Sequence, residues 1–141
     1  MASNSDKEEK VTFITGSTRG IGWETAKLFA KKGMTVLLNG VSDEKLLNNR
    51  VSELKENYAC ECQGFLFDVS DVDEVKKCYQ AVFKKYKRLD VLVNNAGIFK
   101  ANLLGMIMPD EIDRIIDVNV KGVLYNMQYA SRLMARNQSG S

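Results

Sequence analysis

A cluster of three glycines, placed directly after a short apolar run, constrains this chain more than any other feature. The apolar run covers residues 11–15, and the glycines are Gly16, Gly20 and Gly22. Such a run is typical of a strand buried on both faces of a parallel sheet. From residue 21 to residue 32 apolar residues recur at helical spacing, so the glycines occupy a turn between a strand and a helix. The residues in phase are Ile21, Thr25, Leu28 and Phe29.

A turn of this kind suits the binding of a pyrophosphate. Gly16 allows a tight turn off the strand, Gly20 lets the backbone approach the ligand, and Gly22 permits close packing of helix against sheet. The free N–H groups of the first helical turn then point at the phosphates. The spacing G-x-x-x-G-x-G differs from the G-x-G-x-x-G fingerprint, and the alternative is a turn that only joins strand to helix. The strand before it and the helix after it favour the ligand site.

The alternation of strand and helix continues along the chain. Further strands are predicted at residues 36–38, 65–67 and 89–93, and further helices at 43–58, 72–86 and 110–134. We expect Ser42 or Asp43 to cap the first of these helices, and Ser70 to cap the second. Crossovers this short force parallel pairing with right-handed connections. The sequence therefore predicts an α/β fold, a doubly wound parallel sheet (Rossmann) with four strands present.

Composition excludes several classes of function. The formal net charge is +2, with both signs spread along the chain, which gives no case for binding nucleic acid or an anionic membrane. No segment approaches the roughly 20 apolar residues of a membrane span. The chain has no histidine, and its cysteines, Cys60, Cys62 and Cys78, lack the spacing of metal ligands, so no metal site is expected. We expect a cytoplasmic protein with reduced cysteines, a flexible polar arm at residues 1–10, and at residues 11–141 the N-terminal part of a single domain.

Two motifs together indicate a family. They read Thr15-Gly16-x-x-x-Gly20-Ile21-Gly22 and Asn94-Asn95-Ala96-Gly97. From about residue 11 to its end, the chain resembles the short-chain dehydrogenase/reductase family, and within it the 3-oxoacyl-[acyl-carrier-protein] reductases of fatty acid biosynthesis. The resemblance implies NADP-dependent hydride transfer to a carbonyl, such as a 3-oxoacyl group on a carrier protein. Another alcohol or ketone substrate, or a dinucleotide-binding module without catalysis, stays open as an alternative.

The resemblance also implies which residues bind the cofactor. In the family the glycine turn holds the diphosphate, an Asp-Val pair contacts adenine, and the Asn-Ala-Gly stretch lies beside the ribose. Each of these segments follows the carboxyl end of a predicted strand, where a doubly wound sheet binds its ligand. A helix cap is the alternative for Asp68, and a role in holding the backbone between strands is the alternative for Asn94. The expected cofactor-binding residues are Gly16, Ser17, Thr18, Arg19, Gly20, Ile21, Gly22, Val41, Asp68, Val69, Asn95, Ala96 and Gly97.

The residues after the second predicted strand favour NADP over NAD. NAD sites place an acidic residue there to bind the ribose hydroxyls. This chain has Asn39, Gly40 and Val41 at that place, and no acid before Asp43. Arg19 supplies a guanidinium that can pair with a 2′-phosphate, and an ordinary surface arginine is the alternative. Val41 stands where NADP-using relatives often have a second basic residue, which is a departure from the family pattern.

Of the catalytic residues of the family, only one, Asn119, has a counterpart in this chain. By the resemblance, Asn119 matches the asparagine of the catalytic tetrad, which bends its helix and holds a water that links the catalytic lysine to solvent. A polar residue in an apolar helical stretch is expected to be buried with a partner. The alternative is an asparagine that faces solvent.

The rest of the tetrad is a serine and a Tyr-x-x-x-Lys pair, in which the tyrosine protonates the carbonyl oxygen. No tyrosine in this chain has a lysine four residues later, and Ser139 and Ser141 are expected just before a fifth strand. We therefore expect a fragment that is inactive alone and lacks the C-terminal strands and the catalytic helix. The fourth strand would form an open apolar edge. By the resemblance, the full-length protein is expected to be a homo-oligomer joined through its long helix.

Overall fold

The fold is one four-stranded parallel sheet with helices on both faces. The structure, a computed structural model, describes residues 9–141, so the predicted polar arm lies almost entirely outside the described residues. The strands stand in the order β3-β2-β1-β4, and every neighbouring pair is parallel. This arrangement confirms the predicted fold class. The strands are β1 (Val11–Ile14), β2 (Thr35–Gly40), β3 (Cys62–Leu66) and β4 (Val91–Val93).

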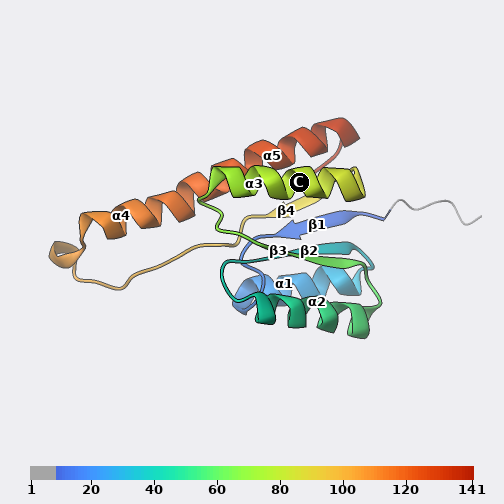
Figure 1. Ribbon diagram of the computed structural model, residues 1–141, viewed down its shortest axis with the longest axis horizontal. Helices are drawn as coiled ribbons and strands as arrows, with labels where there is room; N and C mark the ends of the chain where they lie inside the picture. Colours follow the sequence, from blue (N-terminus) through green and yellow to red (C-terminus); the bar gives the residue numbers. More distant parts are fainter. Residues whose placement is uncertain (1–8) are drawn as a thin grey trace, which may run out of the picture.

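The helices divide between the two faces of the sheet. In Figure 1, α1 and α2 lie on one face and α3 and α5 on the other. The last helical segments form a continuous rod, and its α4 end projects beyond the sheet (Figure 1). Among residues 9–141, no helix combines the length and apolar character needed to cross a membrane. The helical segments are α1 (Gly20–Lys31), α2 (Glu44–Tyr58), α3 (Val72–Tyr86), the 3₁₀ turn η1 (Leu104–Met106), α4 (Pro109–Ile116), the π-helical turn η2 (Asp117–Lys121) and α5 (Gly122–Asn137).

The order of the strands reverses at β1. The chain moves outward from β1 through β2 to β3, and then returns to place β4 on the other side of β1. Ile14, the last residue of β1, pairs with Val93 of β4 and with Leu38 of β2. The segments that follow β1 and β4 therefore begin side by side, which is where a doubly wound sheet forms its ligand crevice.

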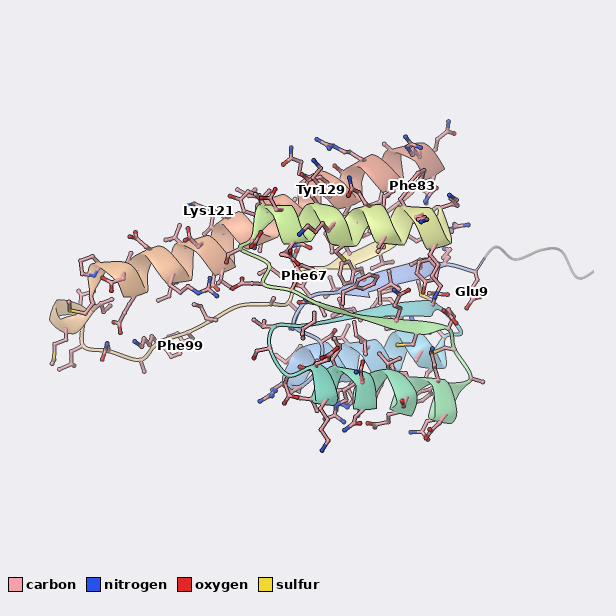
Figure 2. All side chains as sticks on the ribbon, in the orientation of Figure 1. Glu9, Phe67, Phe83, Phe99, Lys121 and Tyr129 are labelled. Carbon is pink, nitrogen blue, oxygen red and sulfur yellow. The ribbon has the colours of Figure 1, made fainter. Side chains whose placement is uncertain are left out.

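Side chains of β1 alternate between two apolar layers. Phe13 is fully buried and meets Tyr79 of α3 edge-on, with ring centroids 5.5 Å apart. Ile14 points the other way, into the layer that contains Trp23 of α1. Phe67 lies between the sheet and α3 (Figure 2). Burial of both faces explains why this strand reads as a continuous apolar run instead of an alternating one.

The buried face of α1 differs from the prediction. Ile21 and Leu28, predicted to be in phase on one face, are 80% and 59% exposed. The buried face carries Gly22, Trp23, Ala26 and Ala30. Three of these four are small, so the helix approaches the sheet closely. Of the large apolar residues predicted to be in phase, Phe29 packs partly buried against this layer, and Ile21 and Leu28 do not.

Two other local predictions need correction. Asp71, and not Ser70, caps α3, because its carboxylate accepts hydrogen bonds from the backbone N–H groups of Asp73 and Glu74. β3 begins earlier than predicted, at Cys62, because Cys62 to Leu66 pair with β2. For α2, Asp43 is the cap and accepts from the N–H of Leu46.

The outer edge of β4 already carries one further residue in parallel register. The backbone N–H of Leu92 donates to the carbonyl of Ser141 at 2.8 Å, and the N–H of Ser141 donates to the carbonyl of Asp90 at 2.9 Å. Ser141 thus takes the position of a residue in a neighbouring parallel strand. The outer edge of β4, which was predicted to be open, is therefore partly paired by Ser141.

Candidate functional site

The glycine turn packs directly against the segment that follows β4. Gly16 has a φ of +60°, and a Cβ added there would lie 2.8 Å from the Cα of Ala96. A Cβ on Gly22 would lie 2.5 Å from Asn95 Nδ2 and 2.5 Å from the carbonyl oxygen of Gly16. The turn therefore requires glycine at both positions: Gly16 for its backbone conformation and close approach, and Gly22 for close approach alone.

Hydrogen bonds join the same two segments. Asn95 Nδ2 donates to the carbonyl oxygens of Thr15 at 3.1 Å and Gly16 at 2.9 Å. The hydroxyl of Thr15 accepts from the backbone N–H groups of Asn95 at 3.1 Å and Ala96 at 3.0 Å. The side chain that holds the backbone is therefore Asn95. Asn94, for which that role was considered, lies in a groove along the outer edge of β4.

Asn39, near the end of β2, holds the glycine turn by a side-chain hydrogen bond. It is 0% exposed, and its Oδ1 accepts from the N–H of Gly16 at 3.0 Å. Its Nδ2 donates to the carbonyl oxygens of Gly40, Phe65 and Phe67 at 3.1–3.3 Å. Of the three residues at the place where an NAD site carries an acidic residue, Asn39 is thus a fully hydrogen-bonded structural amide, and Val41 lines the cavity described below.

Ser17 belongs to this support and not to the ligand surface. Its side chain is buried, and its hydroxyl accepts from the backbone N–H of Asn39 at 2.9 Å. Its own N–H donates to the carbonyl of Asn39 at 3.0 Å. Ser17 was predicted to bind the ligand, but in the structure its side chain joins the glycine turn to β2.

A cavity of about 220 Å³ opens where the segments after the strands meet. Seven predicted residues line it, from the turn after β1 and from the segments after β2, β3 and β4. These are Gly16, Val41, Asp68, Val69, Asn95, Ala96 and Gly97. Ile98, Arg114 and Val118 also line it, and sequence reasoning had assigned none of these three to the site.

Asp68 is the carboxylate of this cavity, and it does not cap α3. Its Oδ1 accepts from the backbone N–H of Ser70 at 2.9 Å and from the Ser70 hydroxyl at 2.7 Å. Its Oδ2 forms an ion pair with Arg114 of α4. Burial opposes ionisation of Asp68, but the hydrogen bonds from Ser70 and Arg114 outweigh it and lower the pKa of the carboxyl.

The remaining residues of the glycine turn, from Thr18 to Ile21, lie outside the cavity lining. Arg19 takes the N-cap position of α1 in an extended conformation, and no side chain caps this helix. The guanidinium of Arg19 is largely exposed, with Nη2 3.9 Å from the carboxylate of Asp43. The first turn of α1 contains no acidic residue, so its N–H groups and Arg19 together form a positive surface.

Arg50 of α2 is a further residue at the turn that the sequence did not reveal. Its Nε donates to the carbonyl oxygen of Thr18 at 3.0 Å. Its guanidinium lies over the ring of Trp23, 4.5 Å from the ring centroid. Arg50 therefore holds the backbone of the glycine turn at Thr18.

Asn119 lies in the π-helical turn η2, where a bend of the helix was predicted. Its side chain is exposed, which contradicts the expected burial, yet both ends of its amide are paired. The N–H of Ile98 donates to Asn119 Oδ1, and Asn119 Nδ2 donates to the carbonyl of Ile98, both at 2.8 Å. Asn119 thus holds the segment after β4 against the helix.

The chain matches a known protein family over nearly its whole length. Residues 10–141 match the family model described as short chain dehydrogenase. The chain is 39% identical over 134 residues to the 3-oxoacyl-[acyl-carrier-protein] reductase FabG of Thermotoga maritima, covering 95% of this chain and 54% of that protein. It is 37% identical over 135 residues to the FabG of Staphylococcus aureus strain Mu50, covering 96% and 54%. The chain spans about half the length of these curated relatives.

Solved structures agree with the family match. An alcohol dehydrogenase from the archaeon Thermococcus sibiricus, complexed with 5-hydroxy-NADP, superposes with a TM-score of 0.88 at 29% identity, over 94% of this chain and 56% of that one. The L-sorbose reductase of Gluconobacter frateurii, complexed with NADPH and L-sorbose, gives 0.90 at 25% identity, over 94% and 50%. Because the family match extends over nearly its whole length, this chain belongs to the short-chain dehydrogenase family.

Proposed function

We propose that this chain is the dinucleotide-binding part of an NADP-dependent oxidoreductase that transfers hydride to a carbonyl carbon. The substrate class we propose is a 3-oxoacyl group on a carrier protein, because the FabG proteins it resembles are named for that activity. One observation carries the binding role. Seven residues expected from the sequence to bind a dinucleotide line one cavity, at the point where the strand order reverses.

The residues present fit such a ligand. Gly16 and Gly22 keep the turn free of side chains, and the uncapped N-terminus of α1 offers N–H groups to a diphosphate. Asp68 and Val69 line the wall where the adenine would lie, and Ala96 and Gly97 line the side of the ribose. When bound, the dinucleotide supplies the hydride, and these residues bind and orient it.

NADP suits the end of β2 better than NAD. A carboxylate there would repel a 2′-phosphate, and Asn39 carries no charge and is wholly engaged with the backbone. Arg19 is largely exposed and lies 3.9 Å from the exposed carboxylate of Asp43, so its guanidinium can exchange this contact for a charged hydrogen bond to a phosphate. The two similar structures described above hold 5-hydroxy-NADP and NADPH.

Asn119 acts in this proposal as a positioning residue. Its amide holds the backbone of Ile98, directly beyond the cavity residues Ala96 and Gly97. No tyrosine among the 141 residues is followed four residues later by a lysine. We therefore expect this chain by itself to bind the dinucleotide without reducing a carbonyl.

A stripe of exposed apolar side chains on the last helices supports a homo-oligomer of the full-length protein. Its members recur every three or four residues from α4 to α5, a spacing that places them along one side of the rod. A partner subunit would remove this surface from water. The residues of the stripe are Ile112, Ile116, Val120, Leu124 and Met127.

Binding of reduced cofactors to the purified chain tests the proposal. We expect NADPH to bind more tightly than NADH when nucleotide fluorescence is titrated. Arg19→Ala should weaken NADPH by about tenfold or more, since a charged hydrogen bond to phosphate is lost, and leave NADH unchanged. Arg132→Ala is the matched control, because Arg132 lies over the ring of Tyr129, away from the cavity. An unchanged NADPH/NADH ratio in Arg19→Ala would contradict the role of Arg19, and no binding of either nucleotide would contradict the proposed function.

A further inference from the structure

Arg114, Ser70 and Asp68 form a closed ring of hydrogen bonds at the cavity wall. Arg114 Nη1 donates to the Ser70 hydroxyl oxygen at 2.7 Å, and Arg114 Nη2 donates to Asp68 Oδ2. The Ser70 hydroxyl in turn donates to Asp68 Oδ1 at 2.7 Å. Both oxygens of the carboxylate are therefore held, and its plane is fixed relative to the fork of the guanidinium.

This ring joins two parts of the chain that are distant in sequence. Arg114 lies in the last turn of α4, 46 residues after Asp68. α4 contains no buried residue, and it projects beyond the end of the sheet (Figure 1). The ring therefore ties an otherwise weakly packed helix to the segment between β3 and α3.

Arg114 also stands between two cavities. It lines the cavity of about 220 Å³ that contains Asp68, and a neighbouring cavity of about 360 Å³ between residues 98–100 and α4. Phe99, on the extended segment after β4, lines the neighbouring cavity and lies away from the sheet in Figure 2. The guanidinium thus forms one wall of the space assigned above to the adenosine half of the dinucleotide.

We propose that Arg114 is a positioning residue for adenosine binding: it holds the Asp68 carboxylate in the orientation that receives the adenine amino group. This inference rests on the proposed function. A carboxylate that is fixed before the ligand arrives loses less conformational freedom on binding than a free one. Arg114 acts through Asp68 and does not itself need to contact the nucleotide.

The test uses the purified chain and adenosine 2′,5′-bisphosphate, which represents the adenosine half of NADP. Binding is measured by calorimetry for the wild type, Arg114→Ala, Arg114→Lys, Asp68→Asn and the double variant Arg114→Ala with Asp68→Asn. Arg132→Ala is again the matched control, since it removes an arginine from the same continuous helix away from the cavity. Circular dichroism at each titration temperature reports whether the variants are folded.

We expect Arg114→Ala to weaken binding by about tenfold and Arg114→Lys to recover part of that loss, because lysine keeps the charge but not the fork. In the Asp68→Asn background the Arg114→Ala substitution should have no further effect. Reduced nicotinamide mononucleotide, the other half of the cofactor, should bind all variants equally.

Three results would overturn the inference and leave the proposed function standing. Unchanged affinity in Arg114→Ala would remove any role for Arg114. Additive losses in the double variant would mean that Arg114 contacts the nucleotide directly, and equal losses for the nicotinamide half would mean a general structural effect. A wild-type chain that binds neither NADPH nor adenosine 2′,5′-bisphosphate would overturn the proposed function, and this inference with it.

Discussion

The side-chain amide of Asn119 forms two hydrogen bonds with the main chain of Ile98, each 2.8 Å long. Ile98 belongs to no strand or helix. The side-chain amide of Asn119 therefore supplies the two hydrogen bonds that a neighbouring backbone segment would otherwise form with Ile98. Asn119 sits in the π-helical turn, and a Cβ on Gly97 would lie 3.3 Å from its Oδ1. The segment that lines the cavity after β4 is thus held in place by a helix more than twenty residues later.

Asn119→Ala should release this segment. We expect a loss of about 1–2 kcal/mol in the free energy of unfolding, measured by urea denaturation, because two hydrogen bonds disappear at an exposed position. The amide of Ile98 should exchange with deuterium faster in the variant. Asn48→Ala, at an exposed position on α2, serves as the control. Equal exchange of Ile98 in Asn119→Ala and wild type would contradict this role.

Gly22→Ala should be strongly destabilising. The added methyl group would lie 2.5 Å from both Asn95 Nδ2 and the carbonyl oxygen of Gly16, and neither neighbour can move without breaking the contact between the two motifs. We expect a loss of about 2–3 kcal/mol in unfolding free energy. Gly105→Ala, where nothing lies within 4 Å of the new methyl group, should change stability by less than about 0.5 kcal/mol. Similar stabilities for the two variants would refute the packing argument.

Asn39 should tolerate neither alanine nor aspartate. Asn39→Ala removes the acceptor of the Gly16 N–H and a donor shared by three carbonyl oxygens, and Asn39→Asp brings a carboxylate to those same oxygens. We expect each variant to lose about 2–4 kcal/mol in a urea titration. An aspartate at this position should therefore not create a stable NAD site. A folded Asn39→Asp variant of wild-type stability that prefers NADH would disprove this interpretation.

Stability should fall at acid pH in a way that depends on Asp90. This buried carboxylate accepts from the N–H of Val11 at 2.8 Å and from Arg88 at 2.7 and 2.9 Å. Burial opposes its ionisation, but these hydrogen bonds prevail and lower its pKa. A lowered folded-state pKa gives stability that is present above the unfolded value of about 3.9 and is lost as pH falls through the folded value. The difference in unfolding free energy between wild type and Asp90→Asn should therefore be constant from about pH 5 to 7 and shrink below about pH 4; a pH-independent difference would exclude this linkage.

The three cysteines should be unreactive in the folded protein. All are buried, and burial raises the pKa of each thiol, that of Cys62 to about 12. Since the thiolate is the reactive form, we expect negligible reaction with a thiol reagent at pH 8 and full reaction in denaturant. Rapid labelling of native protein would show that the segments that carry these cysteines open readily.

Local patterns in the sequence predicted much of the fold. Residues 11–15 read as a strand because both faces of β1 are buried, and Asp43 was one of two candidate caps because a short side-chain oxygen satisfies the first turn of a helix. One error came where size matters more than polarity: small residues bring α1 onto the sheet, so Ile21 points to solvent. The other came from tertiary contacts: the hydroxyl of Ser70 donates to Asp68 and accepts from Arg114, and Asp71 caps α3 instead.

Spacing and side-chain type along the chain were enough to predict the glycine turn and the alternation of strands and helices, because both depend on neighbours a few residues apart. Most of the residues that line the cavity were predicted from the family resemblance of the glycine turn and of residues 94–97. Three contacts could be seen only in the folded chain: Asn95 holds the turn in place of Asn94, Asn39 is a structural amide, and Arg114 pairs with Asp68. Each of these contacts joins segments more than twenty residues apart, and such a pairing depends on how strands and helices are placed in space, which no local pattern encodes.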